Sequence, residues 1–222
     1  MKTANFMCPS YHYWQKIILK NPNPQTIEEK YNQGFVLTRL KNEMHQIKGL
    51  RVDLKNFQLS SENRRILRKT RDYIVSLEPL PLKEYDWRIH KVGAGFYQKR
   101  FGENIFSANK IKELIVDSKK SSFNCLAVAK DQKISQDIGW CISFKTKNIF
   151  HYAYPFYELK YFKNNLGISM MLKTLLLAKQ SGIRYFYLGS VWDKRAKYKL
   201  QFSPQEFFDG QNWQDVKNLT FV

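Results

Sequence analysis

The sequence predicts an α/β fold, and the order of elements in its second half is the main reason. Segments 123–129, 138–144 and 150–157 are apolar or aromatic, which is typical of buried strands. A helix at 166–180 with one apolar face and a strand at 183–188 follow them. This β-β-β-α-β order predicts a sheet covered by helices and excludes a helical bundle. Because 43% of the 222 residues are hydrophobic, there is enough apolar material for one large domain or for a small and a medium one.

The first half of the chain carries weaker signals. The segment 21–24, Asn-Pro-Asn-Pro, predicts a turn or loop, because each proline lacks a donor and restricts the residue before it. A short helix is expected at 26–32, ending near Gly34, and a strand at 49–57. Another helix is expected at 109–117.

The helix predicted most clearly covers residues 60–77. Ser60 or Ser61 can cap its N-terminus, and Glu62 lies in the first turn, where the helix dipole favours a carboxylate. At a helical period one face is apolar and the opposite face is cationic, consisting of Arg64, Arg65, Arg68, Lys69 and Arg71. This cationic face is interpreted either as a phosphate-binding surface or as an ordinary solvated face.

The prolines after this helix indicate a boundary between two parts of the chain. Pro79-Leu80-Pro81 cannot continue a helix, since proline removes a backbone donor. We therefore expect an N-terminal region at 1–78 and a catalytic domain at 79–222.

The net charge indicates the kind of partner. The chain has 37 Lys and Arg against 19 Asp and Glu, which gives +18 at pH 7. A surface this positive attracts polyanions by counterion release, and nucleic acid is the commonest polyanion of the cytoplasm. A proteome rich in lysine is the alternative explanation. No apolar run is long enough for a membrane span, and the N-terminus lacks a signal peptide, so we expect a cytoplasmic protein without a membrane partner.

Sequence signatures of several enzyme classes are absent. There is no G-x-S-x-G, H-E-x-x-H, Walker or G-x-G-x-x-G motif. The cysteines Cys8, Cys125 and Cys141 are far apart, which is typical of free thiols in a core, and the four histidines stand alone. No metal site is therefore expected. The loop at 164–169 (NNLGIS) is a degenerate version of the coenzyme A loop of GNAT acetyltransferases, because Asn164 and Ser169 depart from its end positions.

Four blocks of the sequence, and a pair of residues near its N-terminus, follow the pattern of one family. The most specific is YFYLGS at 185–190 with KYKLQFSPQE at 197–206, similar to Y-L-G-Y and M-x-Y-K-x-x-[FY]-x-P. The second is YPFYE at 154–158 with Leu166-Gly167, similar to Y-x-F-Y-[DE]-P … S-L-G. A third block, Arg51-Val52 with Phe57, Ser60 and Arg64-Arg65, is similar to R-V … F-x-P-S-R-S-Q-R-R. Gly34-Phe35 is similar to the start of G-F-R-R-S-G, and Cys8 with Tyr11 is similar to C-x-Y-L. Along the chain the blocks occur in the family's order over nearly the whole sequence, and together they resemble the arginyl/leucyl-tRNA–protein transferases.

The chain also departs from that family. The family's cysteine cluster, credited with binding zinc or an iron–sulfur cluster, is replaced by residues 40–50, which contain no cysteine. Val36-Leu37, Ser190 and Ala196 stand where the family has R-R, the second tyrosine of Y-L-G-Y and the Met before Y-K. The resemblance therefore implies a divergent member without the metal site.

The resemblance implies a GNAT-like acyltransferase fold, with a mixed, mostly antiparallel central sheet flanked by helices. It implies that the partners are aminoacyl-tRNA and a protein or peptide N-terminus, with no further cofactor. The expected catalytic residues are Glu158, Tyr187, Tyr198 and Lys199. The expected substrate-binding residues are Tyr154, Tyr157, Asn165, Leu188 and Gly189, and the expected tRNA-binding residues are Arg64, Arg65, Arg68, Arg195 and Lys197.

The predicted reaction is aminolysis of the tRNA ester by an α-amine, for which positioning and a mild base suffice. Glu158 would orient or deprotonate the amine, and Lys199 would bind the terminal phosphate or stabilise the oxyanion. Three alternatives stay open: an acetyl-CoA-dependent N-acetyltransferase, a GNAT-type ligase acting on a peptide, lipid or cell-wall amine, and an inactive tRNA-binding relative.

Overall fold

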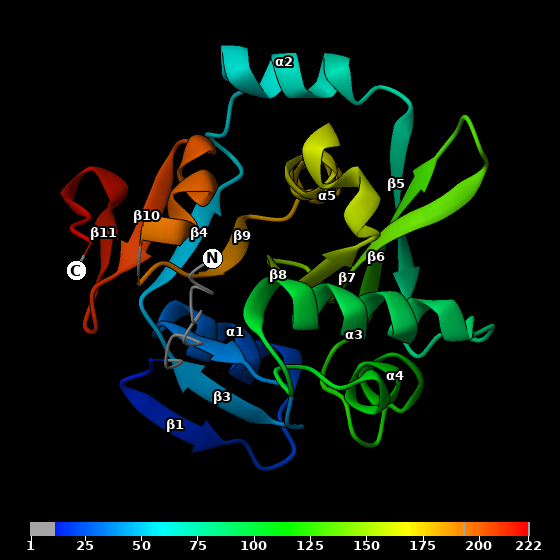
Figure 1. Ribbon diagram of the computed structural model, residues 1–222. Helices are drawn as coiled ribbons and strands as arrows, with labels where there is room; N and C mark the ends of the chain where they lie inside the picture. The colour runs from blue at the N-terminus through cyan, green and yellow to red at the C-terminus, as the bar shows by residue number, and fades with distance from the viewer. Residues whose placement is uncertain (1–11, 193, 222) are drawn as a thin grey trace, which may run out of the picture.

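A computed structural model describes residues 12–192 and 194–221, with the side chain of Arg195 excepted. Its main feature is an eight-stranded sheet in the order β11-β10-β4-β9-β8-β7-β6-β5 (Figure 1). Every neighbouring pair is antiparallel except β8 and β9, which are parallel. The strands are β4 (Gly49–Asp53), β5 (Tyr73–Pro79), β6 (Cys125–Asp131), β7 (Gln136–Lys145), β8 (Ile149–Tyr157), β9 (Tyr185–Ser190), β10 (Gln205–Phe208) and β11 (Trp213–Asp215). The predicted mixed, mostly antiparallel α/β fold is confirmed.

A smaller antiparallel sheet, in the order β1-β3-β2, belongs to the N-terminal part. Its strands are β1 (Gln15–Ile18), β2 (Phe35–Leu37) and β3 (Glu43–Gln46). The helices of the chain are α1 (Pro24–Asn32), α2 (Ser61–Lys69), α3 (Trp87–Phe101), α4 (Ala108–Val116) and α5 (Leu166–Gln180), and the 3-10 helices are η1 (Leu159–Asn164), η2 (Lys194–Gln201) and η3 (Val216–Asn218).

Helices α3 and α5 cover opposite faces of the large sheet. Gly93 of α3 lies against Phe156, whereas Gly167 of α5 lies against the ring of Tyr157. Successive side chains of a strand point to opposite faces, so the two helices enclose β8 between them. The two layers are visible in Figure 1, with α5 on one side of β6–β8 and α3 with α4 on the other.

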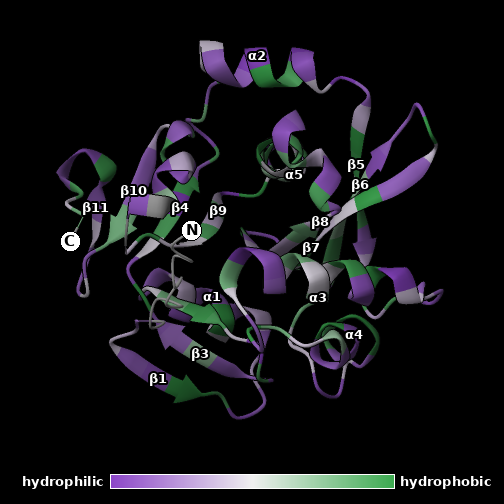
Figure 2. Ribbon diagram, in the orientation of Figure 1, coloured by the Kyte–Doolittle hydropathy of each residue, from purple (hydrophilic) through white to green (hydrophobic). Residues whose placement is uncertain are grey.

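The core is centred on strands β6, β7 and β8. All but one of the β6 residues are buried, and β7 is buried from Ile138 to Phe144. Strands covered on both faces need continuous apolar runs, which is why the sequence predicts these strands well. Figure 2 shows the contrast with α2, whose ribbon is mostly in the hydrophilic colour.

The predicted elements of the second half are confirmed with small shifts at their ends. The helix at 166–180 has the predicted limits, and the helix at 109–117 is α4. The helix expected at 26–32 begins earlier, at Pro24, because the Asn23 side chain accepts a hydrogen bond from the Thr26 amide (2.8 Å). The strand expected at 49–57 ends at Asp53.

The prediction of one helix over 60–77 is wrong in its second half. Ser60 caps α2 as expected, through a hydrogen bond from the Asn63 amide (3.1 Å), but the helix ends at Lys69. Residues Tyr73–Pro79 form β5 instead and pair with β6 along their whole length. In β5 exposure alternates between neighbouring residues, which is the period of a strand and not of a helix. The Ile74-Val75 pair of β-branched residues favours this outcome.

The sequence did not predict α3, β10, β11 or the small sheet. The division at 78/79 stays a prediction about domains, but it falls inside β5. The large sheet takes β4 and most of β5 from before that point, so the two predicted regions share one sheet.

The described ranges contain no helix with the length and hydropathy needed to cross a bilayer. They also contain no group of three or more His, Cys, Asp or Glu side chains placed to hold a metal ion. Cys8 and Tyr11, which take part in the family resemblance, lie outside the described residues.

Candidate active site

The candidate site lies where the parallel strands β8 and β9 stop pairing. They are in register over three residue pairs only, the last of which is His151 with Tyr187. Beyond this pair β8 continues beside β7 and β9 beside β4, and the β7–β8 register shifts between Ile142 and Ser143. The shift leaves Ala153 as an extra residue, because Tyr152 and Tyr154 face consecutive residues of β7. Side chains just beyond the last pair therefore lie at an interruption of the sheet.

Two buried tyrosine hydroxyls lie at this interruption. The Tyr152 and Tyr187 side chains are almost inaccessible, and neither hydroxyl has a described partner in good hydrogen-bond geometry, with the Cys141 thiol near Tyr152 and the Arg51 guanidinium near Tyr187. Burial raises the pKa of both, that of Tyr187 to about 12 despite the opposing effect of the Arg51 guanidinium. Both hydroxyls therefore stay protonated near neutral pH. An unpaired buried donor costs about 1–3 kcal/mol, so these groups are available to hydrogen-bond a substrate carbonyl.

His151, at the last paired position, is held by Tyr31 of α1. The Tyr31 Oη accepts a hydrogen bond from the Leu37 amide (3.3 Å) and lies 2.8 Å from His151 Nδ1. Since the hydroxyl proton is then directed at Nδ1, we assign the neutral Nε2–H tautomer to His151. Burial, with a smaller effect of the Lys199 charge, lowers the pKa of His151 to about 3. His151 is therefore a fixed, neutral imidazole at working pH.

Helix η2 brings the predicted Tyr198 and Lys199 to the end of β9. The Lys199 Nζ donates to the Ser190 carbonyl (2.8 Å), and a Cβ at Gly189 would lie 3.8 Å from it. Gly189 has φ +73°, in the left-handed region that favours glycine. About half of the Tyr198 residue is exposed, but burial of its hydroxyl raises the pKa of Tyr198 to about 12.

The tyrosine hydroxyls around Tyr198 form a cluster with contributions from three elements. Tyr198 from η2 interacts electrostatically with Tyr157, and it affects the ionisation of Tyr97 of α3 and of Tyr152. Tyr97 in turn donates to the Pro155 carbonyl (3.2 Å). We call Tyr97, Tyr152, Tyr157 and Tyr198 the tyrosine cluster. It extends along β8 from Tyr152, immediately beyond the point of divergence, to Tyr157 at the end of the strand.

The predicted substrate-binding residues are divided among three places. Leu188 and Gly189 follow Tyr187 on β9 and share the neighbourhood of Lys199. Tyr157 packs on Gly167 near the start of α5, where Asn165 begins the helix in a left-handed conformation (φ +60°). Tyr154 is on the face of α3 and α4, with its ring centroid 5.3 Å from that of Phe106 and 5.4 Å from that of Phe123. Tyr154 thus packs mainly as an aromatic core residue.

Glu158 lies at the opposite end of β8 from His151. It directly follows Tyr157, the last residue of β8, about 23 Å along the strand from His151 at roughly 3.3 Å per residue. Its carboxylate is 2.7 Å from the Lys160 ammonium and 3.6 Å from the Arg88 guanidinium. The role of Glu158 toward the amine stays a prediction, and these two cations compete with any substrate for the carboxylate.

Two of the predicted tRNA-binding arginines share a surface cavity on α2. Arg64 and Arg68, with Ser61 and Leu67, line a cavity of about 380 Å³. Arg65 instead pairs with Glu62 through two hydrogen bonds (2.6 and 2.5 Å), so the acid reduces its availability for phosphate.

The remaining predicted cations lie on η2 and after the end of α2. Lys197 of η2 is exposed and lies over the Phe221 ring (5.6 Å). Arg195 belongs to η2, but its side chain lies outside the described residues. Arg71, expected on the helix face of Arg64, lies beyond the end of α2.

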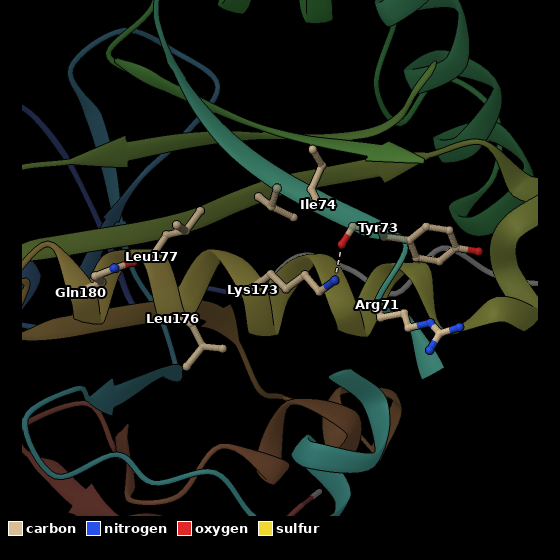
Figure 3. A pocket seen from close by; sticks show the side chains of 8 residues that line it. Arg71, Tyr73, Ile74, Lys173, Leu176, Leu177 and Gln180 are labelled. Atoms are coloured by element: carbon tan, nitrogen blue, oxygen red, sulfur yellow. Dashed lines mark hydrogen bonds between the residues drawn. The ribbon is translucent and has the colours of Figure 1, made fainter. Parts of the chain in front are cut away.

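A second cavity, of about 300 Å³, lies between β5 and α5 and is lined partly by apolar side chains (Figure 3). The Lys173 side chain runs along α5 and donates to the carbonyls of Thr70 (2.6 Å) and Tyr73. Lys173 therefore stabilises the turn between α2 and β5. We assign this cavity no catalytic chemistry.

Sequence reasoning missed Tyr31, His151 and Tyr152 as site residues. His151 and Tyr31 are 120 residues apart in the chain, so no local spacing connects them. A polar ring within the otherwise aromatic segment 150–157 is the one signal that could have directed attention to His151. Arg51, noted only within a block, lies between the rings of Tyr185 and Trp213 (4.1 Å to each) and pairs with Glu206 (2.7 Å).

Comparison with known proteins adds a family to this geometry. The family model described as "Arginine-tRNA-protein transferase, C terminus" matches residues 89–209, more than half of the chain. This match includes most of α3 and the whole of β8, β9 and η2, which build the candidate site.

Similar curated proteins are named aspartate/glutamate leucyltransferase. The one from Saccharophagus degradans is 27% identical over 184 residues, covering 78% of this chain and 71% of the relative. The one from Stenotrophomonas maltophilia K279a is 29% identical over 91 residues, covering 40% of this chain and only 36% of the relative.

Among solved structures, a GCN5-related glucosamine N-acetyltransferase region of a fungal multi-domain β-N-acetylglucosaminidase is 11% identical, with a TM-score of 0.48. It covers 86% of this chain and 23% of that chain. From the family match over residues 89–209, the chain belongs to the arginine-tRNA–protein transferase family.

Proposed function

We propose that the protein is an aminoacyl-tRNA-dependent transferase that adds an amino acid to the N-terminal α-amine of a protein. The observation that carries the proposal is the position of the family match, which covers both diverging strands together with η2. Because aminoacyl-tRNA is a cytoplasmic substrate, the proposal places the reaction in the cytoplasm. The net charge of +18 supports a polyanionic partner.

The proposed reaction is aminolysis of an ester. The acceptor's α-amine attacks the aminoacyl carbonyl, a C–N bond forms, and the C–O bond to the tRNA ribose breaks. The proton lost by the amine is transferred to the departing ribose oxygen. A free α-amine has a pKa of about 7.7–8.0, so a large fraction of it is already neutral and nucleophilic near pH 7.5. Holding the two substrates together supplies much of the barrier reduction.

The residues at the strand divergence support this chemistry without a covalent enzyme intermediate. The protonated hydroxyls of Tyr152 and Tyr187 are buried donors without a well-aligned acceptor, as an oxyanion site requires. The Lys199 ammonium, beside the Ser190 carbonyl, supplies a positive charge for the developing oxyanion or for the terminal phosphate. Positive charge and protonated donors together favour the tetrahedral intermediate over the ester.

For the amino acid and the acceptor, the proposal follows the names of the relatives. These names specify leucine as the transferred amino acid and aspartate or glutamate as the acceptor. We propose leucine over arginine for this chain, and an acidic N-terminal residue as the acceptor. The cationic surface of the protein is compatible with an acidic acceptor.

The test is incubation of the protein with total charged tRNA and a library of peptides that differ in the N-terminal residue, read by mass spectrometry. We expect the mass of a leucyl residue on peptides that begin with Asp or Glu. An arginyl mass would overturn the choice of amino acid. Modification that requires acetyl-CoA, or absence of transfer from any charged tRNA, would overturn the proposed reaction.

A further inference from the structure

Three exposed aromatic side chains gather around Arg100 at the outer end of the tyrosine cluster. Phe101 is 45% exposed, Phe162 49% and Tyr198 51%. The Arg100 guanidinium lies 4.6 Å from the centre of the Phe162 ring and interacts electrostatically with Tyr198. These four residues come from α3, η1 and η2. We call them the aromatic patch.

Buried residues hold the patch in place. Phe101 stacks on Tyr97 with ring centroids 5.5 Å apart and contacts Phe96 (6.4 Å). Phe96 in turn packs on Tyr157, 4.8 Å away. Because the rings that support Phe101 are buried, they restrict its side chain, which lowers the entropy lost when a flat ligand stacks on it.

The charge around the patch is positive. Lys99, Lys160 and Lys163 are exposed on the segments that carry it, in addition to Arg100. Of the acids next to these segments in the sequence, Glu158 is already paired with Lys160 and Arg88. Aromatic rings interleaved with cations match a ligand with flat rings and a negative backbone.

We infer that the aromatic patch binds the single-stranded 3′ end of the tRNA, with its unstacked bases on Phe101, Phe162 and the exposed part of Tyr198 and with phosphate on Arg100. This inference rests on the proposed function. Single-stranded RNA is recognised by stacking of its free bases on aromatic side chains and arginine planes. The bases of a paired stem are stacked on one another and are not available for this contact. Tyr198 belongs to the patch, and the next residue, Lys199, is hydrogen-bonded to the Ser190 carbonyl at the end of β9, so a strand stacked here leads toward Lys199.

The arginines of α2 have a different role in this arrangement. Arg64 and Arg68 are cations without an aromatic surface in their cavity, whose other lining residues are Ser61 and Leu67. They match the phosphates of a paired stem. The patch therefore accounts for recognition of the end that carries the ester.

The experiment uses a hairpin RNA that ends in the single-stranded 3′ sequence of tRNA, with 2-aminopurine in the tail, and a hairpin lacking the tail. We expect the protein to quench the 2-aminopurine fluorescence and to bind the tailed hairpin more tightly. Phe162→Ala and Phe101→Ala should each weaken binding roughly 5- to 100-fold and reduce the quenching. Phe162→Trp should restore both, because it restores an aromatic face.

The matched control is Trp87→Ala. Trp87 is on the same helix α3, is 61% exposed and has the Lys91 ammonium 5.1 Å from its ring, so it is also an aromatic residue next to a cation. It lies about 21 Å along the helix from Phe101. We expect Trp87→Ala to bind the tailed hairpin as the wild type does. Arg100→Ala should reduce the salt dependence of binding, whereas the Phe variants should leave it unchanged.

The inference is overturned if the Phe variants bind and quench as the wild type, if the tail adds nothing to affinity, or if Trp87→Ala weakens binding as much as Phe162→Ala. A transfer assay in parallel separates this inference from the proposed function. Quenching by a protein that transfers no amino acid would leave the patch and overturn the function. Wild-type transfer rates at limiting tRNA in both Phe variants would leave the function and overturn the patch.

Discussion

The end of the β8–β9 pair and the helix α2 both carry residues predicted to act on tRNA, yet they differ in physical character. His151, Tyr152 and Tyr187 are buried, and Tyr31 fixes the orientation of the His151 ring. The cations of α2 lie on a surface helix, and Arg68 is exposed. Buried, fixed groups can stabilise a transition state, because their charges and dipoles are strong in a low dielectric and need no reorganisation. Exposed cations mainly attract and position a polyanion. Substitutions at the end of the β8–β9 pair should therefore change the rate of transfer or the stability, whereas substitutions on α2 should change the affinity for tRNA.

The largest effect is expected from Lys199→Met at the end of β9. Removing a preorganised charge from the oxyanion should lower the transfer rate about 100- to 1,000-fold. Thermal unfolding should change little, because Lys199 is partly exposed. Lys197→Met is the control on the same helix, and its rate at saturating tRNA should equal that of the wild type. Full activity of Lys199→Met would remove this residue from the mechanism.

The second prediction concerns the support of His151. Tyr31→Phe deletes the hydroxyl between the Leu37 amide and His151 Nδ1 and leaves both groups buried. We expect the free energy of unfolding to fall by about 2 kcal/mol, measured by urea denaturation. The control is Tyr73→Phe, because Tyr73 is only partly buried, so that loss of its hydroxyl leaves less buried polar surface unsatisfied. Equal losses of unfolding free energy in the two variants would show that the buried hydrogen bond adds no stability beyond that of an ordinary tyrosine hydroxyl.

The third prediction follows from the lowered pKa of His151, about 3 in the folded protein against about 6.5 in an unfolded chain. Between these values the unfolded state binds more protons, so stability decreases as pH falls. We expect His151 to account for about 1 kcal/mol of stability lost between pH 6.5 and 5.5. In His151→Gln the unfolding free energy should depend less steeply on pH in this interval. An identical pH dependence in the two proteins would contradict the buried, neutral state of His151.

The smallest effect on stability is expected on α2. Arg68→Gln should change the free energy of unfolding by less than about 0.5 kcal/mol, because the side chain is exposed. It should weaken tRNA binding a few-fold and reduce the salt dependence of binding by about one phosphate contact. Binding should be measured by fluorescence anisotropy at several salt concentrations. Arg65→Gln should weaken binding less, since Arg65 is paired with Glu62. The opposite order would show that Arg65 leaves Glu62 when RNA binds.

The accuracy of the sequence-based predictions also differs between these regions. The helix at 166–180 and the strands before it were predicted well, because buried strands and a helix with one apolar face leave a clear periodic pattern. At 73–79 the helical period was misleading. Tyr73, Ile74 and Leu77 fit a helical face by coincidence, whereas pairing with β6 decided the strand. Tertiary pairing can override local preference in this way.

The sequence by itself determined the α/β class, the strands β6, β7 and β8 with the helix α5 that follows them, and the positive charge. It also determined the motifs of the family to which the chain belongs. Only the tertiary structure decided which residues share the site. It joined Tyr31 to His151 across 120 residues, placed Lys199 on the Ser190 carbonyl, and paired Glu158 with Arg88 and Lys160. Periodicity and motifs record what each segment must bury or bind locally. Burial, tautomer and charge pairing depend on neighbours that are distant in the chain and become adjacent only on folding.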